Sequence, residues 1–202
     1  MVPKYIIVHT AADGGLNDSG KPRPNRNTTY AQIDSWHKAN GWRYFGYHGL
    51  VDLNGKFYPG RKEDETGAHC TSMNMNSQAL GLCMSGHGDY YKWTEPQYQT
   101  MLRIVFGWCK KYNIPFSNVM GHRETGAHKS CPGTKIDCSE IREDLALMEA
   151  KLATTGVLSL AGKTAARLAF TTFYSKVLWP YLPYEVQQQI NVLRKQIIFN
   201  NI

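Results

Sequence analysis

Two histidines and one cysteine stand where they could hold a metal ion. His9 closes an apolar run, His122 follows the short run Val-Met-Gly, and Cys131 lies nine residues later. The end of a strand can aim an imidazole into a cleft, and two imidazoles with one thiolate form a three-ligand set for Zn²⁺ that leaves a fourth position for water. Taken alone at these separations, each residue is more often an ordinary core or surface residue.

The elements that must position these side chains follow from hydrophobic spacing and turn residues. A short strand precedes His9, and a long loop rich in Gly, Asn, Asp and Pro follows it. Thr28 and Thr29 offer a cap for the next helix, and Asn54-Gly55 marks a tight hairpin turn. The expected elements are a strand at 4–9, a loop at 10–27, a helix at about 30–39, a hairpin at 45–58 and a buried strand at 79–84.

The second half of the chain continues the alternation of helices and strands. Thr94 precedes an acid and a proline, which is typical of a helix start, and Asn113-Ile114-Pro115 ends that helix. Residues 118–122 form another short β-like segment, and Ser139 caps a helix through about Ala153. We therefore expect an α/β fold, with a mixed central β-sheet flanked by helices.

The positive charge of the chain is concentrated at one end. The 202 residues carry a formal net charge of +7, and residues 151–202 hold six Lys/Arg but one acid, Glu185. Apolar residues recur at helical spacing within 158–169 and 186–198. We therefore divide the chain into a body, 1–150, and a basic amphipathic helical extension, 151–202. The extension suits contact with an anionic membrane or lipopolysaccharide, or it packs on the body and exposes a solvated basic face.

Composition excludes several classes of protein. The chain is 42% hydrophobic and 19% charged, so it can bury a core. It has no apolar run of about 18 residues for a spanning helix, its N-terminus lacks a secretory signal, and we find no nucleic-acid-reading motif. Five cysteines without a signal argue against a disulfide framework. We expect His37 and His87 at the surface and four cysteines as small buried hydrophobes, namely Cys70, Cys83, Cys109 and Cys138.

The sequence around the three candidate ligands resembles that of a known family, the zinc-dependent N-acetylmuramoyl-L-alanine amidases of type 2. That class includes phage lysozymes of the T7 type and peptidoglycan recognition proteins. The similar motifs occur in family order between residue 5 and about 150. They are Ile-Ile-Val-His-Thr at 6–10, Tyr47-His48 before the Asn54-Gly55 turn, Gly-Ala-His at 67–69, Gly-His-Arg-Glu at 121–124 and Lys-Ser-Cys-Pro-Gly at 129–133.

The resemblance implies a role for each of these residues. His9, His122 and Cys131 would hold one Zn²⁺ at the floor of a surface cleft in an amidase domain spanning 1–150. Lys129 would stabilise the oxyanion. Tyr47 would position the attacking water and shuttle its proton, since a phenol with a pKa near 10 is a poor base at neutral pH. His48 and His69 would contact substrate or support the ligands, or they are ordinary loop histidines.

The resemblance also implies the reaction and its setting. The family hydrolyses the amide between N-acetylmuramic acid and the L-alanine of the stem peptide, and binding-only members commonly have Ser in place of the ligand cysteine. We therefore expect a monomeric enzyme that acts on bacterial peptidoglycan and does not bind nucleic acid. A phage endolysin fits best, held in the host cytoplasm until a holin releases it to the cell wall. The alternatives are a non-catalytic peptidoglycan-binding module and a bacterial wall-recycling amidase.

Overall fold

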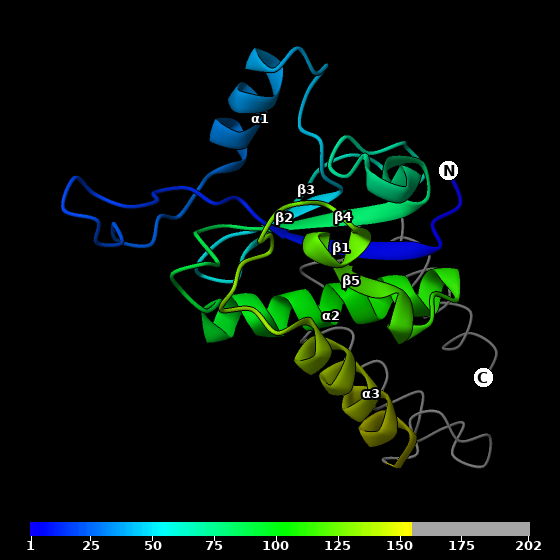
Figure 1. Cartoon of the computed structure of the whole chain (residues 1–202). Coiled ribbons are helices and arrows are strands. Elements are labelled where there is room, and N and C mark those ends of the chain that lie inside the picture. Colours follow the sequence, from blue (N-terminus) through cyan, green and yellow to red (C-terminus); the bar gives the residue numbers. More distant parts are fainter. Residues whose placement is uncertain (155–202) are drawn as a thin grey trace, which may run out of the picture. The chain divides into compact units, whose positions relative to one another are not determined.

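The computed structural model describes residues 1–154 (Figure 1). The chain divides into two compact units, Met1–Ala146 and Leu147–Ile202, and the first contains a five-stranded sheet. The helices expected within 158–169 and 186–198 lie outside the described residues, so the extension 151–202 stays a prediction. In the part of the chain that the structure describes, no helix is long and apolar enough to cross a membrane.

The sheet is mixed, as the sequence predicts. Its strands are β1 (Tyr5–Thr10), β2 (Gly49–Val51), β3 (Phe57–Pro59), β4 (Ala79–Met84) and β5 (Val119–Gly121). They lie in the order β3-β2-β4-β1-β5. β1 pairs in parallel with β4 and β5, β2 pairs in parallel with β4, and β3 runs antiparallel to β2 as the predicted hairpin. The strand that carries His9 is thus held on both sides by parallel neighbours.

Within residues 1–154 three α-helices accompany the sheet, and two begin at the predicted caps. α1 (Tyr30–Ala39) starts with a capping box between Thr29 and Gln32. α2 (Glu95–Tyr112) starts with one between Thr94 and Gln97, and it ends at Asn113, whose φ of 54° is left-handed. Single turns of 3-10 helix occupy Phe116–Asn118 and His122–Thr125, and a longer 3-10 segment occupies Ser72–Ser77.

The predicted start of the third helix is wrong, because the helix begins earlier in the chain. α3 (Cys138–Thr154) begins before Ser139, so Ser139 is not its cap. The Asp137 carboxylate instead accepts a hydrogen bond of 2.8 Å from the Ser139 backbone N–H. Asp and Ser both favour the cap position, so residue type alone does not distinguish Asp137 from Ser139 as the cap.

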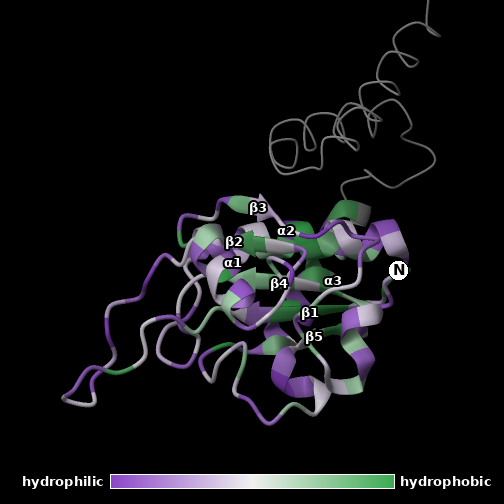
Figure 2. Ribbon diagram, turned by 90° about the horizontal axis from the view of Figure 1, so that it is seen from above, coloured by the Kyte–Doolittle hydropathy of each residue, from purple (hydrophilic) through white to green (hydrophobic). Residues whose placement is uncertain are grey.

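Strand alternation separates two buried faces of the sheet. Ile33 of α1 packs with Leu50 and Cys83, which lie on the same face as His9 because His9 pairs with Cys83 in the β1–β4 register. Figure 1 shows α2 on the opposite side of the sheet from α1. Both faces are covered, and the central strands β1 and β4 are therefore buried along nearly their whole length and mostly apolar; much of β1 is green in the hydropathy colouring of Figure 2. His9 is a polar residue in an otherwise buried apolar layer.

Candidate metal centre

Three separate segments bring the predicted ligands together. His9 comes from β1, His122 follows the last residue of β5, and Cys131 lies in the irregular segment between Gly126 and α3, which we call the cysteine loop (residues 126–137). One donor atom from each of the three residues lies within 4.8 Å of the others. The His9 Nδ1 is 3.7 Å from the Cys131 Sγ, and the rings of His9 and His122 have centroids 4.7 Å apart.

His69 fixes which nitrogen of His9 faces this cluster. The Nε2 of His69 lies 3.3 Å from the Ala79 carbonyl, which can only accept, so this nitrogen carries the proton. The Nδ1 of His69 then accepts a 3.1 Å hydrogen bond from the Nε2 of His9. The Nδ1 of His9 is therefore left unprotonated on the side of Cys131. A carbonyl–histidine–ligand chain of this kind orients a metal ligand.

Glycines give His69 its place on the sheet. A Cβ atom on Gly81 would come within 2.6 Å of the His69 ring, and one on Gly67 within 2.5 Å. Side chains at these positions would push the ring away from β4 and from His9. Gly67 of the Gly-Ala-His motif and Gly81 of β4 therefore both allow the contact between His69 and His9.

Burial sets the protonation of the cluster at neutral pH. Removal from water, with a smaller effect of the neighbouring His69, lowers the pKa of His9 well below 6.5. Burial, and then the charge of Lys129, lowers the pKa of His122 to about 4, and burial raises the pKa of the Cys131 thiol to about 11. Both imidazoles are therefore neutral and need lose no proton to bind a metal. The donors fit Zn²⁺, which takes neutral imidazole and displaces the thiol proton.

Tyr47 lies beside the cluster as a protonated phenol. Its ring centroid is 5.0 Å from that of His9. Burial and the neighbouring Cys83, with which its hydroxyl is hydrogen-bonded, raise the pKa of Tyr47 well above 10. Tyr47 can therefore donate a hydrogen bond at neutral pH, whereas it cannot serve as a base. Cys83 is buried as expected, and its contact with Tyr47 is one that sequence reasoning missed.

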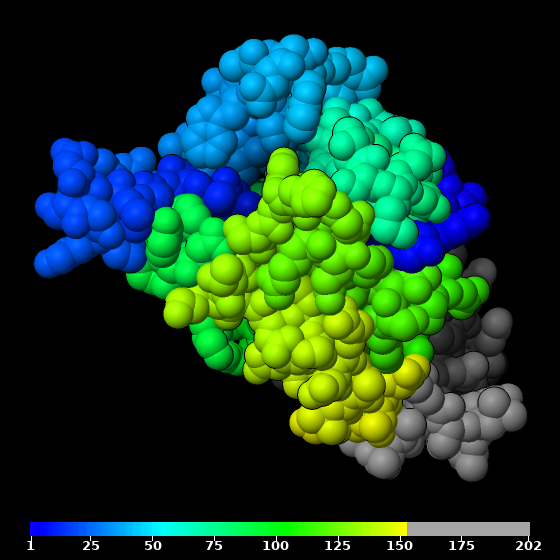
Figure 3. Space-filling model, viewed as in Figure 1, coloured from blue at the N-terminus to red at the C-terminus, as the bar shows by residue number. Residues whose placement is uncertain are grey.

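A groove of about 420 Å³ opens beside the cluster. His69 and His122 lie on its floor, while Trp42 and the exposed Lys129 lie at its walls. Figure 3 shows the three chain segments that form it, around residues 42, 68–76 and 122–129, meeting on the face drawn there. The charge of Lys129, which lines the same groove, contributes to the lowered pKa of His122.

Two further histidines, His48 and His37, bond to the backbone of the fold. His48 is buried, its Nδ1 accepts a 2.9 Å hydrogen bond from the Gly81 N–H, and its Nε2 lies 3.0 Å from the Glu65 carbonyl. Both nitrogens thus bond to backbone. The expectation that His37 lies at the surface is wrong. His37 is buried against Trp42, and its Nδ1 accepts a 2.8 Å hydrogen bond from the Gly46 N–H. His87 is half-buried rather than exposed.

Sequence reasoning also missed Arg123, which supports the cysteine loop from beneath. Its backbone N–H donates to the Cys131 carbonyl at 2.7 Å, and its guanidinium donates to the carbonyls of Gly133 at 2.7 Å and Ile136 at 2.6 Å. Its position directly after His122 was a usable signal. The dipeptide His122-Arg123 thus supplies one candidate ligand and supports the loop that carries another, Cys131.

The protein has an α/β fold with a mixed β-sheet. This fold brings two histidines and a cysteine together beside a groove, and these residues are the donor set of a mononuclear metal site. The family follows from residues 1–134, which match the N-acetylmuramoyl-L-alanine amidases. The chain belongs to that family, as the resemblance predicted.

Known relatives agree with this assignment. The endolysin of Enterobacteria phage T3 is 30% identical over 132 residues, which cover 63% of this chain and 78% of the phage protein. Peptidoglycan-recognition protein SC2 of Drosophila melanogaster is 31% identical over 117 residues, or 57% and 61% of the two chains. Among solved structures, the N-acetylmuramoyl-L-alanine amidase LysC from Clostridium intestinale URNW superposes with a TM-score of 0.62 at 27% identity, covering 72% of this chain and 87% of LysC.

Proposed function

We propose that this chain is a zinc-dependent amidase that cleaves the bond between N-acetylmuramic acid and the L-alanine of the peptidoglycan stem peptide. The observation that carries the proposal is the gathering of His9, His122 and Cys131 within 4.8 Å, beside a groove, in a member of the amidase family. Membership of the family supports the choice of bond, and the donor set supports zinc as the metal.

Zn²⁺ held by these three residues would lower the pKa of a water molecule from 15.7 to about 7 and polarise the scissile carbonyl. The chain's own residues prepare the site for this. His69 holds the Nδ1 of His9 free of a proton. The Lys129 ammonium, at the wall of the groove, is placed to stabilise the negative charge that develops on the carbonyl oxygen.

Tyr47 supplies a proton donor beside His9. Because its pKa is raised by burial, its hydroxyl keeps its proton, donates to the attacking water or the reacting carbonyl, and orients it. We assign Tyr47 to positioning and proton shuttling, with Lys129 as the electrostatic stabiliser.

The setting we propose is host lysis by a phage, with peptidoglycan as the partner. It is supported by the similarity to the endolysin of phage T3 and to the amidase LysC. In this setting the enzyme accumulates in the host cytoplasm and reaches the wall through a holin. The basic extension 151–202 would then meet an anionic membrane or lipopolysaccharide.

Digestion of purified peptidoglycan, followed by mass spectrometry of the products, tests the proposal. We expect stem peptides with a free N-terminal L-alanine and glycan with intact lactyl carboxylates. Cys131→Ser should lose most bound zinc and activity, whereas Cys109→Ser, a buried cysteine of α2, should keep both. Wall binding without cleavage by the unchanged protein would contradict the proposal and identify a recognition module.

A further inference from the structure

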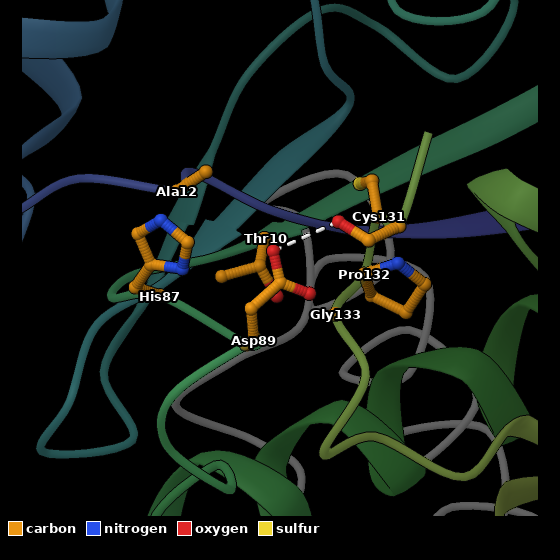
Figure 4. A pocket seen from close by; sticks show the side chains of 9 residues that line it. Thr10, Ala12, His87, Asp89, Cys131, Pro132 and Gly133 are labelled. Atoms are coloured by element: carbon orange, nitrogen blue, oxygen red, sulfur yellow. Dashed lines mark hydrogen bonds between the residues drawn. The ribbon is translucent and has the colours of Figure 1, made fainter. Parts of the chain in front are cut away.

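We propose that Asp89 is a positioning residue for the metal site, because it holds the cysteine loop so that the Cys131 thiol meets His9 and His122. The inference rests on the proposed zinc site. Asp89 lies far from all three donors in the sequence, in the segment that follows β4. Figure 4 shows its carboxylate pointing toward the segment that carries Cys131.

The hydrogen bonds of Asp89 flank Cys131 on both sides. One carboxylate oxygen accepts from the Ser130 hydroxyl at 2.8 Å, and the other accepts from the Thr134 backbone N–H at 2.8 Å. The Thr134 hydroxyl also donates to the Asp89 carbonyl at 3.2 Å. A single carboxylate therefore spans residues 130–134 and fixes the position of the three residues between its two contacts, Cys131 among them.

The backbone beside Asp89 adds a steric support. A Cβ atom on Gly88 would come within 1.8 Å of the Pro132 carbonyl oxygen, and one on Gly133 within 2.0 Å of the Gly88 backbone. The Lys135 N–H donates to the Gly88 carbonyl at 3.0 Å. The segment Gly88–Asp89 thus lies directly against the cysteine loop, with glycine where the two backbones meet.

Asp89 and Arg123 hold different groups of the same loop. Arg123 binds backbone carbonyls, namely those of Cys131, Gly133 and Ile136, while Asp89 binds donors at Ser130 and Thr134. The cysteine loop contains no helix or strand that would fix Cys131 by itself. Its geometry consequently depends on side chains from elsewhere, and partners that orient ligands typically change metal affinity about 10- to 100-fold when removed.

Three variants of the full chain separate positioning from general stability. Asp89→Ala removes both carboxylate contacts. Asp89→Asn keeps an acceptor for Thr134 and a polar partner for Ser130, so it tests geometry without the charge. Asp52→Ala is the matched control, since the Asp52 carboxylate likewise accepts from backbone N–H groups, those of Asn54 and Lys56, in the β2–β3 hairpin.

The readouts are zinc affinity, by competition with a chromogenic chelator, and the absorption of the Co²⁺-substituted protein, whose near-ultraviolet band reports the thiolate–cobalt bond. We expect Asp89→Ala to weaken zinc binding about 10- to 100-fold and to reduce that band, while Asp89→Asn stays near the unchanged protein. Asp52→Ala should lower the melting temperature without altering either readout.

Each other result has a defined meaning. Unchanged zinc affinity and cobalt absorption in Asp89→Ala would overturn the positioning role while leaving the proposed function intact. Equal losses in Asp89→Ala and Asp52→Ala would also overturn it, because they would show a general effect of lost stability. Failure of the unchanged protein to bind zinc would overturn the proposed function and this inference together.

Discussion

The contact between His9 and His69 predicts a measurable change in zinc affinity. His69→Ala removes the acceptor at 3.1 Å from the Nε2 of His9 and leaves this buried N–H without a partner. An unsatisfied buried donor costs about 1–3 kcal/mol. The imidazole can avoid that cost by moving its proton to Nδ1, the nitrogen that faces Cys131. Either outcome weakens zinc binding, by about 10- to 100-fold for lost partners of this kind.

The assay is competition for zinc against a chromogenic chelator, with melting of the metal-free protein measured in parallel. His69→Asn serves as the rescue variant, because its amide oxygen stands close to where the Nδ1 of His69 stood and can accept from His9. His37→Ala is the control, since His37 is also buried but bonds to the Gly46 backbone and not to a candidate ligand. Unchanged affinity in a folded His69→Ala protein would refute the argument about the protonation of His9.

The remaining predictions concern protons and charge at the same site. Tyr47→Phe should keep zinc but lower kcat by about 100-fold, and an equal rate would remove Tyr47 from the mechanism. Lys129→Met should likewise keep zinc and lower kcat by about 100-fold, and a changed KM alone would contradict its role. At pH 7 zinc binding should release one proton from Cys131 and about half a proton from the bound water, whose pKa falls to about 7, because the pKa of His122 is about 4 and that of Cys131 about 11. Calorimetry in buffers of different ionisation enthalpy measures this release, and a value below one proton would contradict it. Since burial lowers the pKa of His69 to about 3, the unfolded chain takes up this proton first as pH falls. The contribution of His69 to the free energy of unfolding is therefore complete above pH 6.5 and is lost toward pH 3, by at most about 1.4 kcal/mol per pH unit. Urea unfolding measured between pH 6.5 and 3 should show a smaller loss of stability with falling pH in His69→Asn. An unchanged pH dependence would contradict this.

Local signals explain why much of the fold was predictable. Thr29 and Thr94 each form a capping box with a glutamine three residues later, and Asn54-Gly55 turns the hairpin. These interactions are made between near neighbours in the chain, so the sequence carries them openly. His9 and His122 were recognisable for a similar reason, since each directly follows a short apolar run.

Contacts between distant segments explain what was missed. His37 reads as a surface residue of a polar helix, yet it is buried because Gly46 and Trp42 pack against it. Asp89 and the cysteine loop are separated by about 40 residues, and nothing local marks either as the partner of the other. The role of Cys83 is hidden in the same way, because an apolar strand accounts for it fully until Tyr47 is placed beside it.

The three candidate ligands differ in how firmly the fold holds them. His9 sits in a strand paired on both sides and is bonded to His69. His122 begins a 3-10 turn in which the Thr125 hydroxyl donates to its carbonyl at 2.7 Å. Cys131 differs from both because it lies in no helix or strand, and its position depends on side chains from other segments. The Cys131 thiol is also the only one of the three donors that must lose a proton to bind the metal. We therefore expect the Cys131–metal bond to be lost first. Variants that loosen the cysteine loop should therefore lose metal before they lose the fold, whereas variants in β1 should lose both together.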